Sequence, residues 1–128
     1  AARRAAAILV VTTSHPARAA EAGRFYRELP ELAGEPAAVV FNRALPASWV
    51  GADPGDAPRQ LAENLERWAA ESLRQSDARA DFGAIHGATV ATIPWLPDPP
   101  TDLAGLERLV SGSAGLPLGS IGVSREVA

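Results

Sequence analysis

The sequence of 128 residues contains no cysteine, no methionine and no lysine, and all twelve of its basic residues are arginine. Without cysteine, the chain has no disulfides, no thiol nucleophile and no cysteine-based zinc site. Without lysine, it has neither a Schiff-base lysine nor the lysine of a Walker-type phosphate loop. Methionine is missing even from position 1. Initiator removal would explain this, but we expect a piece of a longer chain or a mature product.

The charge and the hydropathy are those of an ordinary globular chain of one domain. The net charge is −3 with both signs mixed, which indicates neither nucleic-acid binding nor a basic membrane patch. No apolar run approaches the roughly 18 residues of a transmembrane helix, and no signal peptide is visible. We therefore expect a cytoplasmic protein. Because much of the 47% apolar share is alanine, the core should be modest.

Three apolar runs predict three buried strands, over residues 7–12, from residue 38 onward, and over 88–93. The middle run has no polar alternation and stops abruptly at Asn42-Arg43, which is typical of a strand in a parallel sheet. Amphipathic segments alternate with the strands. The order predicts an α/β fold with a mostly parallel sheet and flanking helices in three layers. Three strands leave exposed edges, so we expect missing strands from upstream chain or a partner.

Cap and proline signals predict where the helices begin and end. The first helix should be capped by Ser14 or His15, and Pro30 should interrupt it or end it near residues 28–29. The second should open at Asp56 and Pro58, with residues 76–87 either extending it or forming a loop. The third should be capped by Thr101 or Asp102. The stripes expected to face inward are Ala22, Phe25, Tyr26, Leu29 and Leu32, then Leu61, Leu65, Trp68 and Leu73, then Leu103, Leu106, Leu109 and Val110.

The carboxyl ends of parallel strands share one rim, where open α/β sheets bind ligands. The loops at this rim are residues 12–16, 42–55 and 94–102. Asn42 offers both a donor and an acceptor to a base edge, and Arg43 could pair with phosphate or cap the sheet. The segment Pro94–Pro100, with four prolines, is either a rigid wall with Trp95 as a stacking surface or a stiff connection.

The remaining polar candidates are interpreted as structural. His15 is expected to be an exposed cap residue, and His86 to lie at the opposite rim. Four carboxylates are expected in loops and caps, and their spacing does not indicate paired-carboxylate catalysis; they are Asp53, Asp56, Asp98 and Asp102. The sequence also contains no glycine-rich phosphate loop.

Three stretches, in order, resemble the ArsA-type anion-pump ATPases, the group that includes the ATPase targeting tail-anchored membrane proteins. They are Ile8-Leu-Val-Val-Thr-Thr-Ser-His-Pro16, Val39-Val-Phe-Asn-Arg-Ala-Leu-Pro46 and Ile93-Pro-Trp-Leu-Pro97 with the leucine-striped segment after Asp102. The likeness spans residues 7–112. It implies a partial P-loop NTPase-like fold in which residues 1–114 form the C-terminal part of the ATPase domain. Residues 115–128 would then be a tail or an edge strand, and the edge strand would lie at residues 120–123.

The resemblance also implies a role. The nucleotide-binding residues would be Asn42, Arg43, Pro94, Trp95, Leu96 and Pro97, which would form the adenine-side wall of an ATP site. The parent protein would bind ATP and magnesium through upstream segments. This chain by itself should therefore not hydrolyse ATP, and it should bind neither ATP nor magnesium firmly. Expected partners are the upstream half or a paired ATPase subunit, as a homo- or heterodimer, and a membrane-protein client, but no nucleic acid.

Some positions depart from the family pattern. His15 stands where the family often has glutamate, the last loop reads Asp98-Pro-Pro-Thr-Asp102, and the CxxC zinc motif of the targeting branch is missing. Two alternatives therefore stay open. One is a degenerate, non-catalytic α/β module that associates with a complete ATPase. The other is an unrelated flavodoxin-like or sugar-nucleotide domain.

Overall fold

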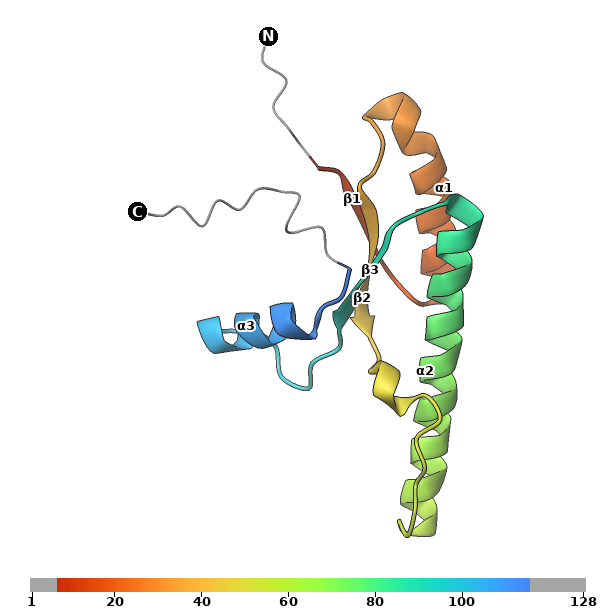
Figure 1. The fold of residues 1–128 in the computed structure, drawn as a ribbon, viewed down its shortest axis with the longest axis vertical. Coiled ribbons are helices and arrows are strands. Elements are labelled where there is room, and N and C mark those ends of the chain that lie inside the picture. The colour runs from red at the N-terminus through yellow and green to blue at the C-terminus, as the bar shows by residue number, and fades with distance from the viewer. Residues whose placement is uncertain (1–6, 116–128) are drawn as a thin grey trace.

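A computed structural model describes residues 7–115 and has the α/β architecture that the sequence predicts (Figure 1). None of the helices in these residues combines the length and hydropathy needed to cross a bilayer. In chain order the elements are β1 (Leu9–Thr13), α1 (Pro16–Leu32), β2 (Ala38–Ala44), the short 3-10 helix η1 (Ala47–Trp49), α2 (Arg59–His86), β3 (Val90–Pro94) and α3 (Leu103–Gly112).

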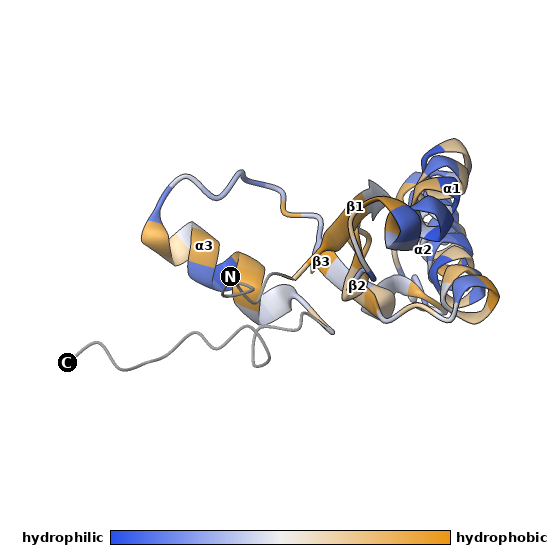
Figure 2. Ribbon diagram, turned by 90° about the horizontal axis from the view of Figure 1, so that it is seen from above, coloured by the Kyte–Doolittle hydropathy of each residue, from blue (hydrophilic) through white to orange (hydrophobic). Residues whose placement is uncertain are grey.

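The three strands form a parallel sheet in the order β1-β2-β3, as predicted. Both crossovers move across the sheet in the same direction, so right-handed connections place α1 and α2 on the same face. Figure 2 shows these two helices together on one side of the sheet and α3 on the other. The result is a three-layer arrangement consistent with part of a P-loop-like fold, with the predicted loops at one rim.

The core lies between β2 and the α1–α2 face. Val39 and Phe41 of β2 are fully buried and pack with Leu29 of α1 and Phe82 of α2. The rings of Phe41 and Phe82 meet edge to face, with centroids 5.5 Å apart. Alternation along β2 sends these two side chains to the helices, and the core is small because alanine supplies much of the remaining lining.

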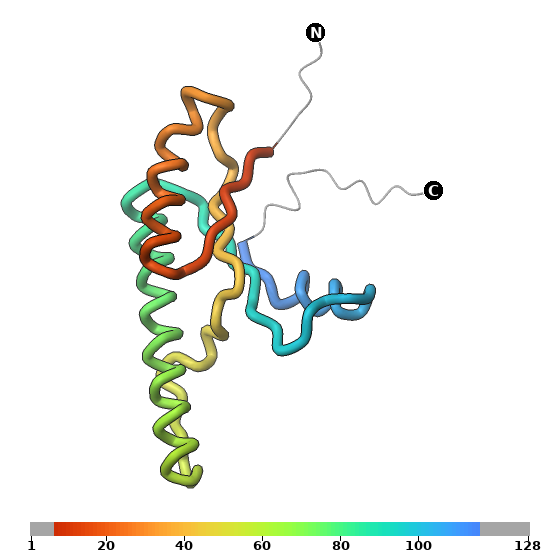
Figure 3. Tube along the Cα trace, turned by 180° about the vertical axis from the view of Figure 1, so that it is seen from behind, coloured from red at the N-terminus to blue at the C-terminus, as the bar shows by residue number. Residues whose placement is uncertain are grey.

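The prediction that the helical stripes face inward was wrong for most of α2 and α3. The four α2 residues are between 39% and 51% exposed, because the N-terminal half of that helix runs past the end of the sheet (Figure 3). In α3, Leu103, Leu106 and Val110 are exposed, since this helix contacts only β3 among the described elements. In α1, Phe25 and Leu32 are exposed although Leu29 is buried.

The helix N-terminal signals were correct where side chains make the cap. His15 caps α1, its Nδ1 accepting from the Ala17 N–H at 3.2 Å, and Asp102 caps α3, its Oδ1 accepting from the Gly105 N–H at 2.7 Å. At α2 the cap is Pro58, which has no side-chain acceptor, so Asp56 lies outside the helix.

Two predicted endings were wrong. Helix α1 continues through Pro30 to Leu32, because a proline this near the last turn removes only one backbone bond. Strand β2 does not stop at Asn42 but runs to Ala44. The ambiguous residues 76–86 are helical, and Gly87 ends α2 in the left-handed conformation at φ 60°. The suggested edge strand at residues 120–123 lies outside the described residues.

His86 packs between aromatic rings at the end of α2, which supports its structural role. Its ring centroid is 4.5 Å from that of Phe82 and 5.9 Å from that of Tyr26. Burial lowers the pKa of His86 below 6.5, and the nearby positive charge of Arg27 lowers it further. The unfolded chain therefore binds a proton at His86 more readily than the folded chain does.

We expect acid to destabilise the fold through this histidine. The free energy of unfolding should fall as the pH drops through about 6.5 and level off below the folded-state pKa, because protonation favours the unfolded chain. Urea unfolding at a series of pH values between 7.5 and 5 would measure the slope. In His86→Gln the slope in this window should be smaller, and an unchanged slope would show that another group causes it.

Candidate functional site

A β-bulge places Asn42 and Arg43 at the carboxyl end of β2. Phe41 pairs with Thr92 and Ala44 pairs with Pro94, so β2 has one more residue than β3 over this stretch. Arg43 takes up the excess at φ 56°, the one non-glycine residue in the described range with a positive φ. The Arg43 N–H donates to the Asn42 Oδ1 at 2.9 Å. Bulges redirect side chains and are frequent beside active sites, and a left-handed non-glycine residue often marks one.

The chain after the bulge is fixed to α2 by two polar contacts. The Leu45 N–H donates to the Gln75 Oε1 at 3.0 Å, and the Ser72 hydroxyl donates to the Pro46 carbonyl at 2.8 Å. Ser72 is 1% exposed. Helix α2 therefore holds the end of β2. This contact explains why Ser72 and Gln75, which a prediction based on apolar stripes does not include, face the sheet side of α2.

The proline segment after β3 is fixed at both ends. The Trp95 N–H donates to the Ala44 carbonyl at 2.8 Å, which continues the β2–β3 pairing beyond the bulge. At the other end, the start of α3 approaches so closely that a Cβ on Gly105 would lie 2.9 Å from the Pro100 Cα. The segment is thus a wall whose position is set by its neighbours.

These elements enclose a cavity of about 470 Å³, here called the rim cavity. All six residues that the sequence singles out for nucleotide binding line it. Two further prolines of the Pro94–Pro100 segment also line it, and so does Leu109, which the sequence did not indicate as a site residue. Asn42 is half-buried and Trp95 is 40% exposed. The lining residues are Asn42, Arg43, Pro94, Trp95, Leu96, Pro97, Pro99, Pro100 and Leu109, of which Arg43 alone is charged.

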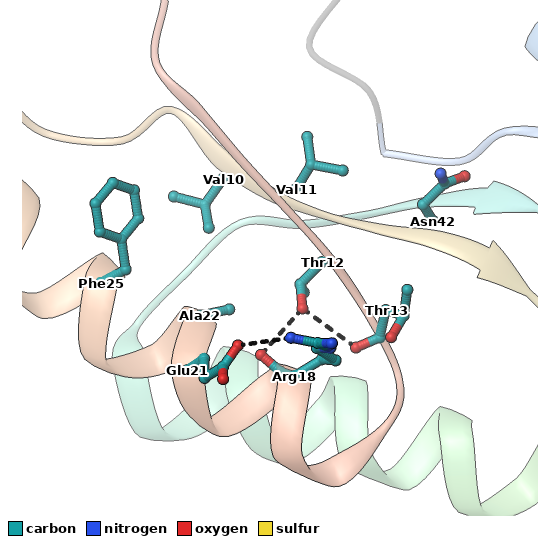
Figure 4. A pocket seen from close by; sticks show the side chains of 9 residues that line it. All are labelled: Val10, Val11, Thr12, Thr13, Arg18, Glu21, Ala22, Phe25 and Asn42. Atoms are coloured by element: carbon teal, nitrogen blue, oxygen red, sulfur yellow. Dashed lines mark hydrogen bonds and ion pairs between the residues drawn. The ribbon is translucent and has the colours of Figure 1, made fainter.

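A second cavity, of about 440 Å³, lies along the outer edge of β1 (Figure 4). In the described residues this edge has no partner strand, and Val11 is 62% exposed. Asn42 and Val11 lie on the side of the sheet opposite α1 in Figure 4. Arg18 and Glu21 of α1 form an ion pair of 3.2 Å at the other wall. Asn42 lines both cavities and so lies between them.

Two other rim residues, Ser14 and Asp53, make hydrogen bonds that hold the protein structure. Arg79 of α2 donates through Nη1 to the Ser14 hydroxyl at 3.2 Å, and burial lowers the pKa of this arginine. Asp53 Oδ1 accepts from the Gly55 N–H within its own loop at 2.9 Å. Between residues 7 and 115 no three His, Asp or Glu side chains gather in a way that could hold a metal ion.

No protein-family model matches this chain, and neither does any curated protein. Its function is therefore inferred from the geometry and chemistry of the cavities.

Proposed function

We propose that this chain supplies the adenine-side wall of an ATP site, as the C-terminal part of an ArsA-type ATPase domain. The observation that carries the proposal is the rim cavity, where an amide, an indole and a proline wall converge at the ends of two parallel strands. A volume of about 470 Å³ is in the range of small-molecule sites. The exposed face of Trp95 offers a stacking surface for a purine.

Asn42 is the residue suited to recognise the base. Its Oδ1 accepts from the Arg43 N–H, which orients the side chain and leaves the amide NH2 group as the free donor. Adenine presents ring-nitrogen acceptors, so an NH2 donor matches it. The bulge thus serves two purposes, since the same hydrogen bond sets the conformation of Arg43 and directs the donor of Asn42.

The phosphates and magnesium belong to another part of the proposed assembly. The chain has no lysine, and its described residues offer no cluster of metal ligands. In this proposal a cytoplasmic parent ATPase hydrolyses ATP, while this segment alone binds adenosine and ATP about equally and without magnesium. A magnesium-dependent preference for ATP by this chain alone would contradict that division.

The proposal is tested by titrating the chain with adenosine, guanosine, ATP and inorganic triphosphate while recording amide and indole NMR signals. Adenosine and ATP should shift the signals of Asn42, Arg43 and Trp95, whereas triphosphate alone should not. Asn42→Asp is the matched variant, because it keeps an oxygen acceptor for the Arg43 N–H but lacks the NH2 donor. We expect it to weaken adenosine binding about tenfold, as for a lost hydrogen bond of roughly 1.4 kcal/mol. Shifts from triphosphate alone, or none from adenosine, would refute the proposal.

The open edge of β1 favours association under either function, whether with the phosphate-binding half or as a degenerate module beside a complete ATPase. An unpaired, apolar edge strand is a template for pairing with another chain. We expect light scattering to detect concentration-dependent self-association, and Val11→Arg to abolish it without changing the unfolding free energy by more than about 0.5 kcal/mol. Ile85→Arg is the control, since Ile85 is 74% exposed on α2, away from this edge. Monomers at all concentrations would argue against this role of the edge.

A further inference from the structure

All three tryptophans of the chain line a single further cavity of about 440 Å³, here called the tryptophan pocket. Trp49 comes from η1, Trp68 from α2 and Trp95 from the segment after β3; Leu45 and Arg43 complete the lining. The rings of Trp49 and Trp68 meet at 66° with centroids 6.1 Å apart. The chain has only seven aromatic residues in Phe, Tyr and Trp together, so this concentration is a local feature.

The pocket is accessible to a ligand. Trp68 is 51% exposed and Trp95 is 40% exposed, so apolar indole surface remains in contact with water. Flat aromatic ligands pack on such surfaces by offset or edge-to-face contact. Trp68 is not among the residues of the hydrophobic core cluster, so the core does not account for the ring at this position.

Arg43 sets the charge of the ligand. It is the one charged residue lining the pocket, and no carboxylate among residues 7–115 forms an ion pair with it. A cation would be repelled, which argues against an ammonium cage. A guanidinium pairs well with a carboxylate, sulfonate or phosphate. The bulge holds the Arg43 backbone at φ 56°, so the position of the side chain at the pocket is built into the sheet.

We propose that the tryptophan pocket is a second ligand site, for a planar aromatic molecule that carries a negative charge. It lies beside the rim cavity and shares Arg43 and Trp95 with it, while Trp68 lines the tryptophan pocket but not the rim cavity, and Asn42 lines the rim cavity but not the tryptophan pocket. The two sites can therefore be tested separately.

The probe is 8-anilinonaphthalene-1-sulfonate, with neutral N-phenyl-1-naphthylamine as its matched control. Energy transfer from the tryptophans would report binding near them, and the variants would assign it to the tryptophan pocket or to the rim cavity, since Trp95 lines both. We expect one sulfonate per chain, bound at least tenfold more tightly than the neutral analogue. Arg43→Gln should remove that preference. Trp68→Leu should weaken sulfonate binding at least tenfold but leave adenosine binding intact.

Leu103→Ala, which changes a 73% exposed apolar residue on α3, should leave sulfonate binding unchanged. Circular dichroism would check the fold of each variant. If Trp68→Leu does not fold, Trp49→Leu replaces it as the deciding variant, because Trp49 lines the tryptophan pocket but not the rim cavity. Equal affinity for the charged and neutral probes, or sulfonate binding unaffected by the deciding variant, would overturn this proposal. Neither result would bear on adenosine binding, so the two proposals can fail independently.

Discussion

Replacing Phe41 with alanine should remove most of the stability of this chain, lowering the free energy of unfolding by about 3–5 kcal/mol. Phe41 is 0% exposed at the centre of β2 and packs edge to face on Phe82. The cavity left behind could not be filled easily, because Val39 and Leu29 are already packed in the same cluster. The free energy of unfolding of small domains is only about 5–15 kcal/mol, so this one substitution should leave the folded chain only marginally stable.

The matched control is Phe25→Ala. Phe25 is 48% exposed beside the edge of β1, so the same truncation there removes half-solvated surface and should cost less than about 1.5 kcal/mol. Urea unfolding followed by circular dichroism would measure both variants. Similar losses for the two would mean that the cluster around β2 is not the principal core, and that the edge of β1 is covered in solution.

The parallel sheet was predictable because its signals are local and agree with one another. Unalternating apolar runs indicated buried strands. The residues around two helix starts narrowed each cap to a pair that contains the observed cap, His15 or Asp102. The crossover rule then required a parallel sheet with its loops at one rim. That rule also explains why residues as far apart in sequence as Asn42 and Pro97 line one cavity.

The exposure of the helical stripes could not be read from the sequence, because periodicity shows which face of a helix is apolar but not what covers that face. Leu61 and Leu73 have the spacing of core residues, yet both are about half exposed on α2. The geometry of three strands decides this, since a sheet this narrow cannot cover a helix of 28 residues. The same reasoning applies to α3, which contacts only β3.

The left-handed conformation at the bulge and the cluster of tryptophans were not predicted from the sequence. Glycine is the usual signal of a left-handed residue, and at the bulge that conformation is adopted by Arg43. The tryptophans are widely separated in sequence, and only the contact of η1 with α2 brings Trp49 beside Trp68. Signals for both existed in principle, since the Asn-Arg pair interrupted an apolar run and Trp49 was the one large apolar residue in its loop.

The second large effect is expected at Ser72, whose buried hydroxyl bonds α2 to the chain that follows β2. Ser72→Val should lower the free energy of unfolding by about 2–4 kcal/mol. The variant removes the hydroxyl that donates to the Pro46 carbonyl at 2.8 Å, which leaves that carbonyl only the Trp49 N–H at 3.1 Å, and it adds bulk at a position that is 1% exposed. Because Pro46 immediately precedes η1, the change should also loosen Trp49 from Trp68 and shift tryptophan emission in the folded state.

Ser76→Val, one turn further along α2, provides the control. Ser76 makes no hydrogen bond to other described side chains or backbone groups outside the helix, so this variant has the same change in helix propensity without the lost contact. Chemical unfolding and tryptophan emission should separate the two variants, with an effect below about 1 kcal/mol and native emission for the control. If the variants lose equal stability, the cost comes from valine in the helix. In that case the Ser72–Pro46 bond does not hold the end of β2, and the geometry of Arg43 must depend on the bulge alone.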